Sequence, residues 1–231
     1  MGSEMCIRDR DKPVSIEPNI YKVEGAGGNK KKRVVTVPPD SRDEDGGSDP
    51  SDPTHSEMQY RLLELGAQLG LSIWAPLQDR GKCWGDKKIG DISGYVEKLP
   101  GQFPPVAMRT VKYIDVIWIE KEAVAAAFEI EHTSTIYSGL LRMSDLLTVQ
   151  PNLRIRWYIV APDKRFEKFA NEVARPTFSS FRTPLHEICK FLPYNALSEK
   201  LNDAEQFVKY LKPGFLDDVA EGFDPEEAFN D

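Results

Sequence analysis

The chain has 231 residues, which is enough for one domain with a substantial core and additional segments. Its content of 40% hydrophobic and 29% charged residues is ordinary for a globular protein. No apolar run approaches the roughly 18 residues that a membrane span needs. Three widely spaced cysteines, Cys6, Cys83 and Cys189, exclude a zinc ribbon and a disulfide framework, so we expect a cytoplasmic protein.

The formal net charge of −7 argues against a chain that is basic throughout, as many DNA-binding proteins are. Much of the acidity, however, lies in residues 40–52 and 199–231, outside or at the end of the expected core. The charge balance therefore does not exclude a nucleic-acid partner for the core itself.

The first 53 residues show no apolar period. Residues 1–10 contain Met-Cys-Ile-Arg-Asp-Arg, which looks like a translated sequencing adaptor, so we expect a scar that replaces a natural upstream segment or domain. A genuine N-terminus without structure is the alternative. Residues 11–53 are rich in glycine and charge and are interpreted as a linker.

The expected domain covers residues 54–212 and is followed by an acidic tail at 213–231. Thr54 and Glu57 have the capping-box spacing, and apolar residues recur at helical spacing to Leu69. Residues 77–110 contain many glycines and prolines, which favour turns and short extended pieces, and Ile89, Ile92 and Val96 fit an edge strand or hairpin. The remaining pattern predicts strands at 71–74, 113–120, 123–131, 154–161 and 188–192, and helices at 135–149, 163–173 and 195–211. This order predicts an α/β fold of three layers with a mixed central sheet.

Three acidic residues stand out on the two central strands. Glu129 and Glu131 point to the same face because side chains alternate along a strand, and Asp115 lies on the strand expected to pair with them. Buried carboxylates are costly unless a partner compensates their charge, and Mg²⁺ prefers such oxygen ligands. The pattern therefore indicates a metal site, with a solvated strand end as the alternative.

The runs Ile114-Asp115-Val116 and Phe128-Glu129-Ile130-Glu131, followed by a helix and a strand, resemble the PD-(D/E)xK or restriction-endonuclease-like superfamily over residues 54–173. The resemblance implies an αβββαβ core. It further implies that Asp115 and Glu129 bind Mg²⁺ or Mn²⁺ and that Glu131 is catalytic at the place where the family usually has lysine. A further acidic ligand from the first helix would be Glu57, or Glu64.

Two residues near the acidic pattern are candidates for substrate contact. His132 could bind substrate or hold the strand end, and Arg142 could bind a phosphate or lie on the surface. We expect a magnesium-dependent endonuclease of restriction or defence type that acts on DNA. The sequence leaves open whether the protein forms a homodimer. The alternatives are a catalytically inactive member of this fold that binds DNA or protein, and an accessory protein without a nucleic-acid role.

Overall fold

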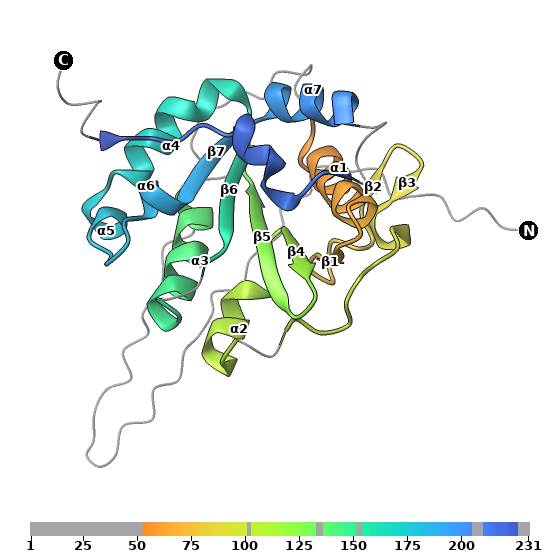
Figure 1. Cartoon of the computed structure of the whole chain (residues 1–231), viewed down its shortest axis with the longest axis horizontal. Helices are drawn as coiled ribbons and strands as arrows, with labels where there is room; N and C mark the ends of the chain where they lie inside the picture. Colours follow the sequence, from red (N-terminus) through yellow and green to blue (C-terminus); the bar gives the residue numbers. More distant parts are fainter. Residues whose placement is uncertain (1–52, 101–102, 133–135, 152–153, 205–209, 226–231) are drawn as a thin grey trace, which may run out of the picture.

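A five-stranded mixed sheet forms the centre of the protein (Figure 1). The computed structural model describes residues 53–100, 103–132, 136–151, 154–204 and 210–225. The strands, in spatial order, are β1 (Ser72–Trp74), β4 (Val116–Glu120), β5 (Ala123–Ile130), β6 (Arg156–Ala161) and β7 (Cys189–Pro193). β1, β4 and β5 pair antiparallel, whereas β5, β6 and β7 pair parallel, which confirms the predicted mixed sheet.

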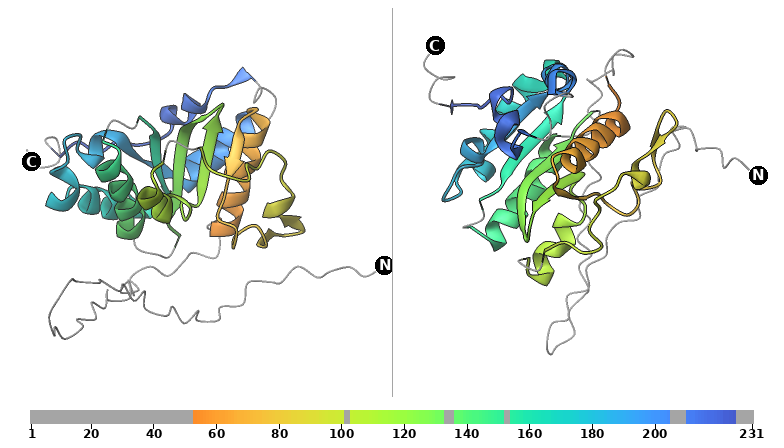
Figure 2. Two further views of the ribbon diagram at one scale, coloured as in Figure 1. Left: turned by 90° about the horizontal axis from the view of Figure 1, so that it is seen from below. Right: turned by 45° about the vertical axis from the view of Figure 1, so that its right-hand side comes forward.

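Helices cover both faces of the sheet and produce three layers (Figures 1 and 2). One face carries α1 (His55–Gln68), α7 (Tyr194–Ala204) and the 3₁₀ segment η4 (Pro213–Asp218). The other face carries α2 (Pro105–Val111), α3 (Ile136–Val149), α4 (Phe166–Val173), α5 (Pro176–Ser179) and α6 (Leu185–Ile188). The α/β class and the predicted layers are confirmed. Within the described ranges, no helix is long and apolar enough to cross a bilayer.

Residues 77–100 and 103–110 form a small hairpin and short helical segments beside the sheet. The hairpin consists of β2 (Cys83–Trp84) and β3 (Lys87–Lys88), and η1 (Ile89–Asp91) follows it directly. A hairpin is therefore present, but it precedes the residues expected to form it, since Ile89 belongs to η1. The helix α2 was not predicted, because Pro104 and Pro105 favoured a break, whereas Pro105 occupies the first turn of the helix, where proline is tolerated.

Helix α1 begins as the capping box predicts. The hydroxyl of Thr54 accepts a hydrogen bond from the Glu57 amide at 3.1 Å. Near the other end of the helix, Gly66 faces Trp118 on β4 so closely that a Cβ atom there would lie 2.5 Å from the indole nitrogen. This nitrogen donates to the carbonyl of Leu62 at 2.9 Å, which fixes the helix against the sheet.

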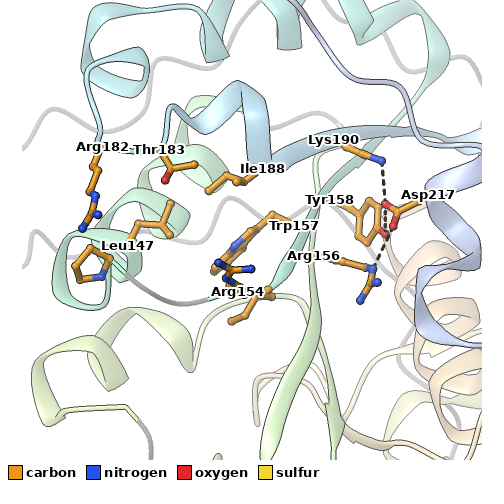
Figure 3. Close-up of a pocket in the computed structure, with 12 residues that line it drawn as sticks. Leu147, Arg154, Arg156, Trp157, Tyr158, Arg182, Thr183, Ile188, Lys190 and Asp217 are labelled. Atoms are coloured by element: carbon orange, nitrogen blue, oxygen red, sulfur yellow. Dashed lines mark hydrogen bonds and ion pairs between the residues drawn. The ribbon is translucent and has the colours of Figure 1, made fainter.

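Residues 213–225, which the sequence analysis separated as an acidic tail, pack against the sheet instead. Leu216 of η4 is fully buried, and Asp217 binds Tyr158, Arg156 and Lys190 from β6 and β7 (Figure 3). Two backbone hydrogen bonds join Glu221 to Phe191. Residues 1–52, which contain the predicted adaptor scar and nearly all of the predicted linker, lie outside the described part of the chain.

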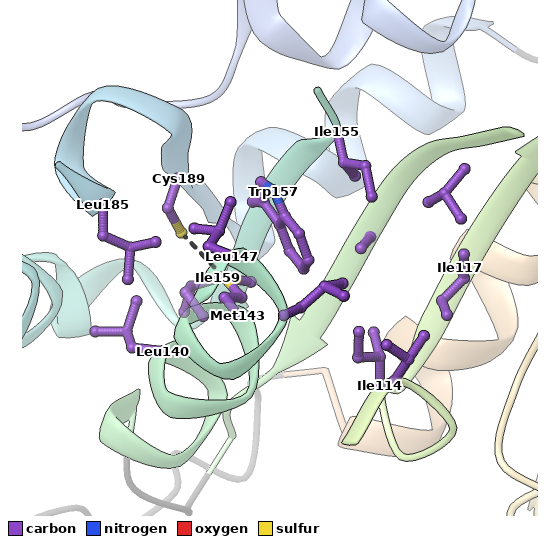
Figure 4. Close-up of a cluster of buried hydrophobic side chains, with 14 of the residues drawn as sticks. Ile114, Ile117, Leu140, Met143, Leu147, Ile155, Trp157, Ile159, Leu185 and Cys189 are labelled. Carbon is purple, nitrogen blue, oxygen red and sulfur yellow. Dashed lines mark hydrogen bonds between the residues drawn. The ribbon is translucent and has the colours of Figure 1, made fainter. Parts of the chain in front are cut away.

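The larger apolar core lies between the sheet and α3 (Figure 4). Leu140, Met143 and Leu147 project from α3 toward Trp157 and Ile159 of β6, as the helical spacing predicted. This core holds α3 across β5 and β6 and thereby fixes the first turns of α3 over the end of β5.

Candidate functional site

The three predicted carboxylates meet at the carboxyl end of β5. Asp115 lies directly before β4, Glu129 is the penultimate residue of β5, and Glu131 follows the strand. Glu129 and Glu131 are 0% and 1% exposed. Both face the start of α3, since a Cβ atom on Gly139 would lie 2.9 Å from Oε1 of Glu131 and 3.1 Å from Cβ of Glu129. The predicted common face of the two glutamates is therefore confirmed.

Arg142, one turn further along α3, binds Glu129 through two hydrogen bonds. Its Nε atom lies 2.7 Å from Oε1 of Glu129, and a terminal guanidinium nitrogen lies 2.8 Å from Oε2. The same nitrogen lies 3.8 Å from Oε1 of Glu131. This is the bidentate geometry that makes arginine–carboxylate pairs strong. Arg142 therefore binds the acidic pair itself in this structure.

Asp115 is fixed by groups from two neighbouring elements. Its Oδ2 atom accepts a hydrogen bond from the Ile130 amide at 2.8 Å and lies 3.5 Å from Nε2 of His55. Its carbonyl oxygen accepts a hydrogen bond from Gln59, which is fully buried. Burial raises the pKa of Asp115, but His55, the Ile130 amide and Arg142 together outweigh burial and hold this pKa below its ordinary value.

The pKa of Glu129 is shifted in the opposite direction. Burial raises its pKa well above the ordinary value, and the nearby carboxylates of Asp115 and Glu131 raise it further, while Arg142 lowers it. The pKa of Arg142 is raised by Glu129, so the guanidinium stays charged. Three carboxylates thus share one permanent positive charge, which leaves an excess of negative charge when all three are ionised.

Three other candidate site residues, Glu57, Glu64 and His132, contact residues outside the carboxylate cluster. Glu57 pairs with Arg61 on the surface of α1 at 2.8 Å, and Glu64 accepts a hydrogen bond from Tyr60. The residue of the first helix that reaches Asp115 is His55. The ring of His132 stacks on Tyr194 of α7 with 6.0 Å between the ring centres.

Sequence reasoning missed three residues that build this site. Arg165 of η2 donates to the carbonyl oxygens of Glu131 and His132, which fixes the chain after β5. Gln59 and His55 approach Asp115 from α1. The only sequence feature that singled out His55 is that histidine is rare in this chain, which has three. Nothing in the spacing indicated Arg165, which lies 34 residues after Glu131.

The donor set is chemically suited to a hard divalent cation. It offers carboxylate oxygens with excess negative charge, and Mg²⁺ typically takes one or two carboxylates together with water. In the described part of the chain, no three His, Cys, Asp or Glu side chains are placed to hold a metal ion. Arg142 would have to release Glu129 before that carboxylate could bind a cation.

A family model for the C-terminal domain of the type II restriction enzyme NmeDI matches residues 36–223. The chain belongs to this family. The match contains all three carboxylates and Arg142, and it begins inside the segment 11–53 that was interpreted as a linker.

A curated relative is also similar to the chain. The chain is 36% identical over 152 residues to the type II restriction enzyme NmeDI of Neisseria meningitidis serogroup C. The alignment covers 63% of this chain and 41% of that enzyme, so the chain spans less than half of its length. No solved structure matches.

Proposed function

We propose that this chain is the nuclease domain of a restriction-type enzyme that hydrolyses phosphodiester bonds in DNA with the help of Mg²⁺ or Mn²⁺. The observation that carries the proposal is the cluster at the end of β5, in which the buried Glu129 and Glu131 and the partly exposed Asp115 surround one guanidinium. If the hairpin β2–β3, η1 and α2 are set aside as an insertion between β1 and β4, the order α1, β1, β4, β5, α3, β6 corresponds to the αβββαβ core that the resemblance implies. Membership of a restriction-enzyme domain family supports the same function.

Asp115 and Glu129 would be the protein ligands of the cation, with Glu131 next to them. When bound, such a cation supplies positive charge to the scissile phosphate and lowers the pKa of a water molecule. The surrounding residues orient the carboxylates. His55 and the Ile130 amide keep Asp115 ionised and oriented, and Arg165 fixes the backbone that carries Glu131.

Arg142 would act on the substrate once it leaves Glu129. Glu131 stands where the family usually has a lysine, so the chain lacks that positive charge at this place. The Arg142 guanidinium lies within 4 Å of both glutamates, and its side chain is 28% exposed, so it can turn toward solvent. In that position it would bind a DNA phosphate and replace the missing lysine charge.

Two cationic side chains, one from α1 and one from the β2–β3 hairpin, lie beside the ring of Trp84. The Arg61 guanidinium lies 5.2 Å from the centre of the Trp84 ring on β2. The Lys87 amine lies at the same distance from this ring. Arg61 lies on the same helix as His55, so the hairpin extends the site along α1. Lysine and arginine at such a surface would contact the DNA backbone, and Trp84 would stack on a base.

The second candidate function is DNA binding without catalysis. One observation favours it: both carboxylate oxygens of Glu129 already bind Arg142, so Glu129 offers no free ligand in this arrangement. A domain of this kind would serve a longer enzyme as a recognition module.

Plasmid cleavage in Mg²⁺, Mn²⁺ and Ca²⁺ distinguishes the two functions. The full chain should cleave in Mg²⁺ or Mn²⁺, and Glu129→Gln should cleave at least about 100-fold more slowly, since it removes one ligand charge. Glu122→Gln, in the exposed turn between β4 and β5, is the matched control and should cleave normally. Cleavage that persists in Glu129→Gln would overturn the site assignment. DNA binding without cleavage in any of the three ions would establish the second function.

A further inference from the structure

A cavity of roughly 900 Å³ lies at the amino ends of β6 and β7, at the opposite end of these strands from the carboxylate cluster (Figure 3). Leu147, at the far end of α3 from Gly139, forms part of its wall. Eight helical residues separate these two positions, or about 12 Å at 1.5 Å per residue. The cavity is therefore separate from the site proposed above, and its volume is in the range that holds a nucleotide-sized ligand.

Positive charge dominates the lining of this cavity although the whole chain carries a net charge of −7. The charged residues that line it are Arg154, Arg156, Arg182, Lys190 and Asp217. Four cations against one carboxylate give the cavity a formal charge of +3. A concave surface with such an excess of one charge attracts ligands of the opposite sign.

Both oxygens of the single carboxylate in the lining, that of Asp217, already accept hydrogen bonds. Oδ1 of Asp217 accepts hydrogen bonds from Tyr158 at 2.9 Å and Lys190 at 3.1 Å, and Oδ2 accepts one from Arg156 at 3.1 Å. By contrast, neither Arg154 nor Arg182 makes an ion pair with another residue in the described part of the chain. Two arginines therefore remain available on the side of the cavity away from Asp217.

A buried donor in the same cavity also lacks a partner. Trp157 lines the cavity and is 1% exposed, and its indole N–H makes no hydrogen bond among the described residues. A buried N–H without an acceptor is unfavourable, because the hydrogen bond that it made to water is not replaced. An anion beside Trp157 would supply the missing acceptor and would at the same time neutralise the two arginines.

We propose that this cavity is a second anion-binding site, in which Arg154, Arg182 and the indole N–H of Trp157 bind a phosphate group. Guanidinium groups match phosphate oxygens in geometry and charge, and an indole N–H supplies one further donor. A free nucleotide and the backbone of a DNA strand both carry this group. The proposal does not depend on cleavage, because binding here requires neither the carboxylate cluster nor a divalent cation.

The experiment follows the indole N–H signals of the ¹⁵N-labelled full chain by NMR in the presence of EDTA. The chain has four tryptophans, and Trp157→Phe assigns the relevant signal. Deoxyadenosine monophosphate and a short DNA duplex are titrated separately. We expect a saturable shift of the Trp157 signal, with binding weakened about tenfold in Arg154→Gln and in Arg182→Gln.

Arg109→Gln is the matched control, because Arg109 is an exposed arginine on α2 outside this cavity. It should leave the affinity unchanged. A response to the mononucleotide identifies a free nucleotide as the source of the phosphate, and a response to the duplex alone identifies the DNA backbone. The proposal is overturned if neither titrant shifts the Trp157 signal, or if Arg109→Gln weakens binding as much as the cavity variants do.

Discussion

The guanidinium of Arg142 supplies two hydrogen bonds to a carboxylate that is completely removed from water. In Arg142→Gln, Glu129 would be left beside Asp115 and Glu131 without a permanent positive charge. Breaking a buried ion pair from one side costs about 3–5 kcal/mol. We expect a loss of this size in the free energy of unfolding at pH 8, measured by urea denaturation.

The loss of folding stability in Arg142→Gln should be larger at high pH than at low pH. The pKa of Glu129 is raised in the folded protein, and the variant raises it further, so the folded state holds a proton that the unfolded state releases above about pH 4.5. Stability therefore falls as pH rises from that value through the folded pKa, and the variant should be much closer to the parent at pH 5 than at pH 8. Glu129→Gln introduced together with Arg142→Gln should remove this dependence. Equal losses at both pH values would show that Glu129 does not carry the effect.

His55 is predicted to set the ionisation of Asp115. Removing the imidazole in His55→Ala takes away a group that lowers the pKa of Asp115, so this pKa should rise. Because a depressed carboxyl pKa contributes stability that is lost as pH falls through it, the acid-induced loss of stability should begin at a higher pH in the variant. A ¹³C NMR titration of the Asp115 carboxylate measures the shift. His186→Ala, in α6, is the control and should leave the Asp115 titration unchanged.

At the scale of elements, two glycines let helices lie close to the two faces of the sheet. Alanine in a helix is about 1 kcal/mol more favourable than glycine, so an unobstructed Gly→Ala change would stabilise the protein. At Gly139 the added Cβ would meet Glu129 and Glu131 at 3.1 and 2.9 Å, and at Gly66 it would meet the Trp118 indole at 2.5 Å. We expect both variants to lose stability, by about 1–3 kcal/mol, since overpacking outweighs the helical gain.

The two glycine variants should differ in activity. Gly139→Ala displaces the glutamate carboxylates and should reduce DNA cleavage strongly, whereas Gly66→Ala acts far from them and should leave cleavage intact at a temperature where the variant is folded. Thermal unfolding and plasmid cleavage measured on the same samples separate these effects. If Gly139→Ala were more stable than the parent, α3 would not approach β5 as closely as described.

Local patterns predicted most of the elements and the acidic cluster, whereas the partners of that cluster could not be predicted. Alternation along the strand placed Glu129 and Glu131 on one face, and the hairpin brought Asp115 beside them. By contrast, the attachment of Arg142 to Glu129 and of Arg165 to Glu131 depends on how helices cross the sheet. Sequence periodicity shows which face of α3 is buried but does not show which residue of β5 that face meets.

The largest correction to the fold concerns the end of the described chain, where composition was misleading. Residues 213–225 contain acidic side chains without a helical or strand period, and this suggested a tail. The segment nevertheless carries one fully buried leucine and an aspartate that joins β6 to β7. A few anchoring contacts therefore attach an irregular segment to the whole molecule, and such contacts leave no period in the sequence.

Leu216 allows this attachment to be tested at the scale of the whole domain. Its side chain is 0% exposed and belongs to the second apolar core, which also contains residues of α1, β5 and β6. Truncation of a buried leucine to alanine costs about 2–5 kcal/mol, so Leu216→Ala should lower the free energy of unfolding by this amount in urea denaturation. Leu77→Ala removes the same atoms from a residue that is 73% exposed and should change the stability by less than about 0.5 kcal/mol. If the two variants were equally stable, residues 213–225 would not unfold together with the rest of the domain. The part of the cavity wall that Asp217 provides would then be formed only part of the time.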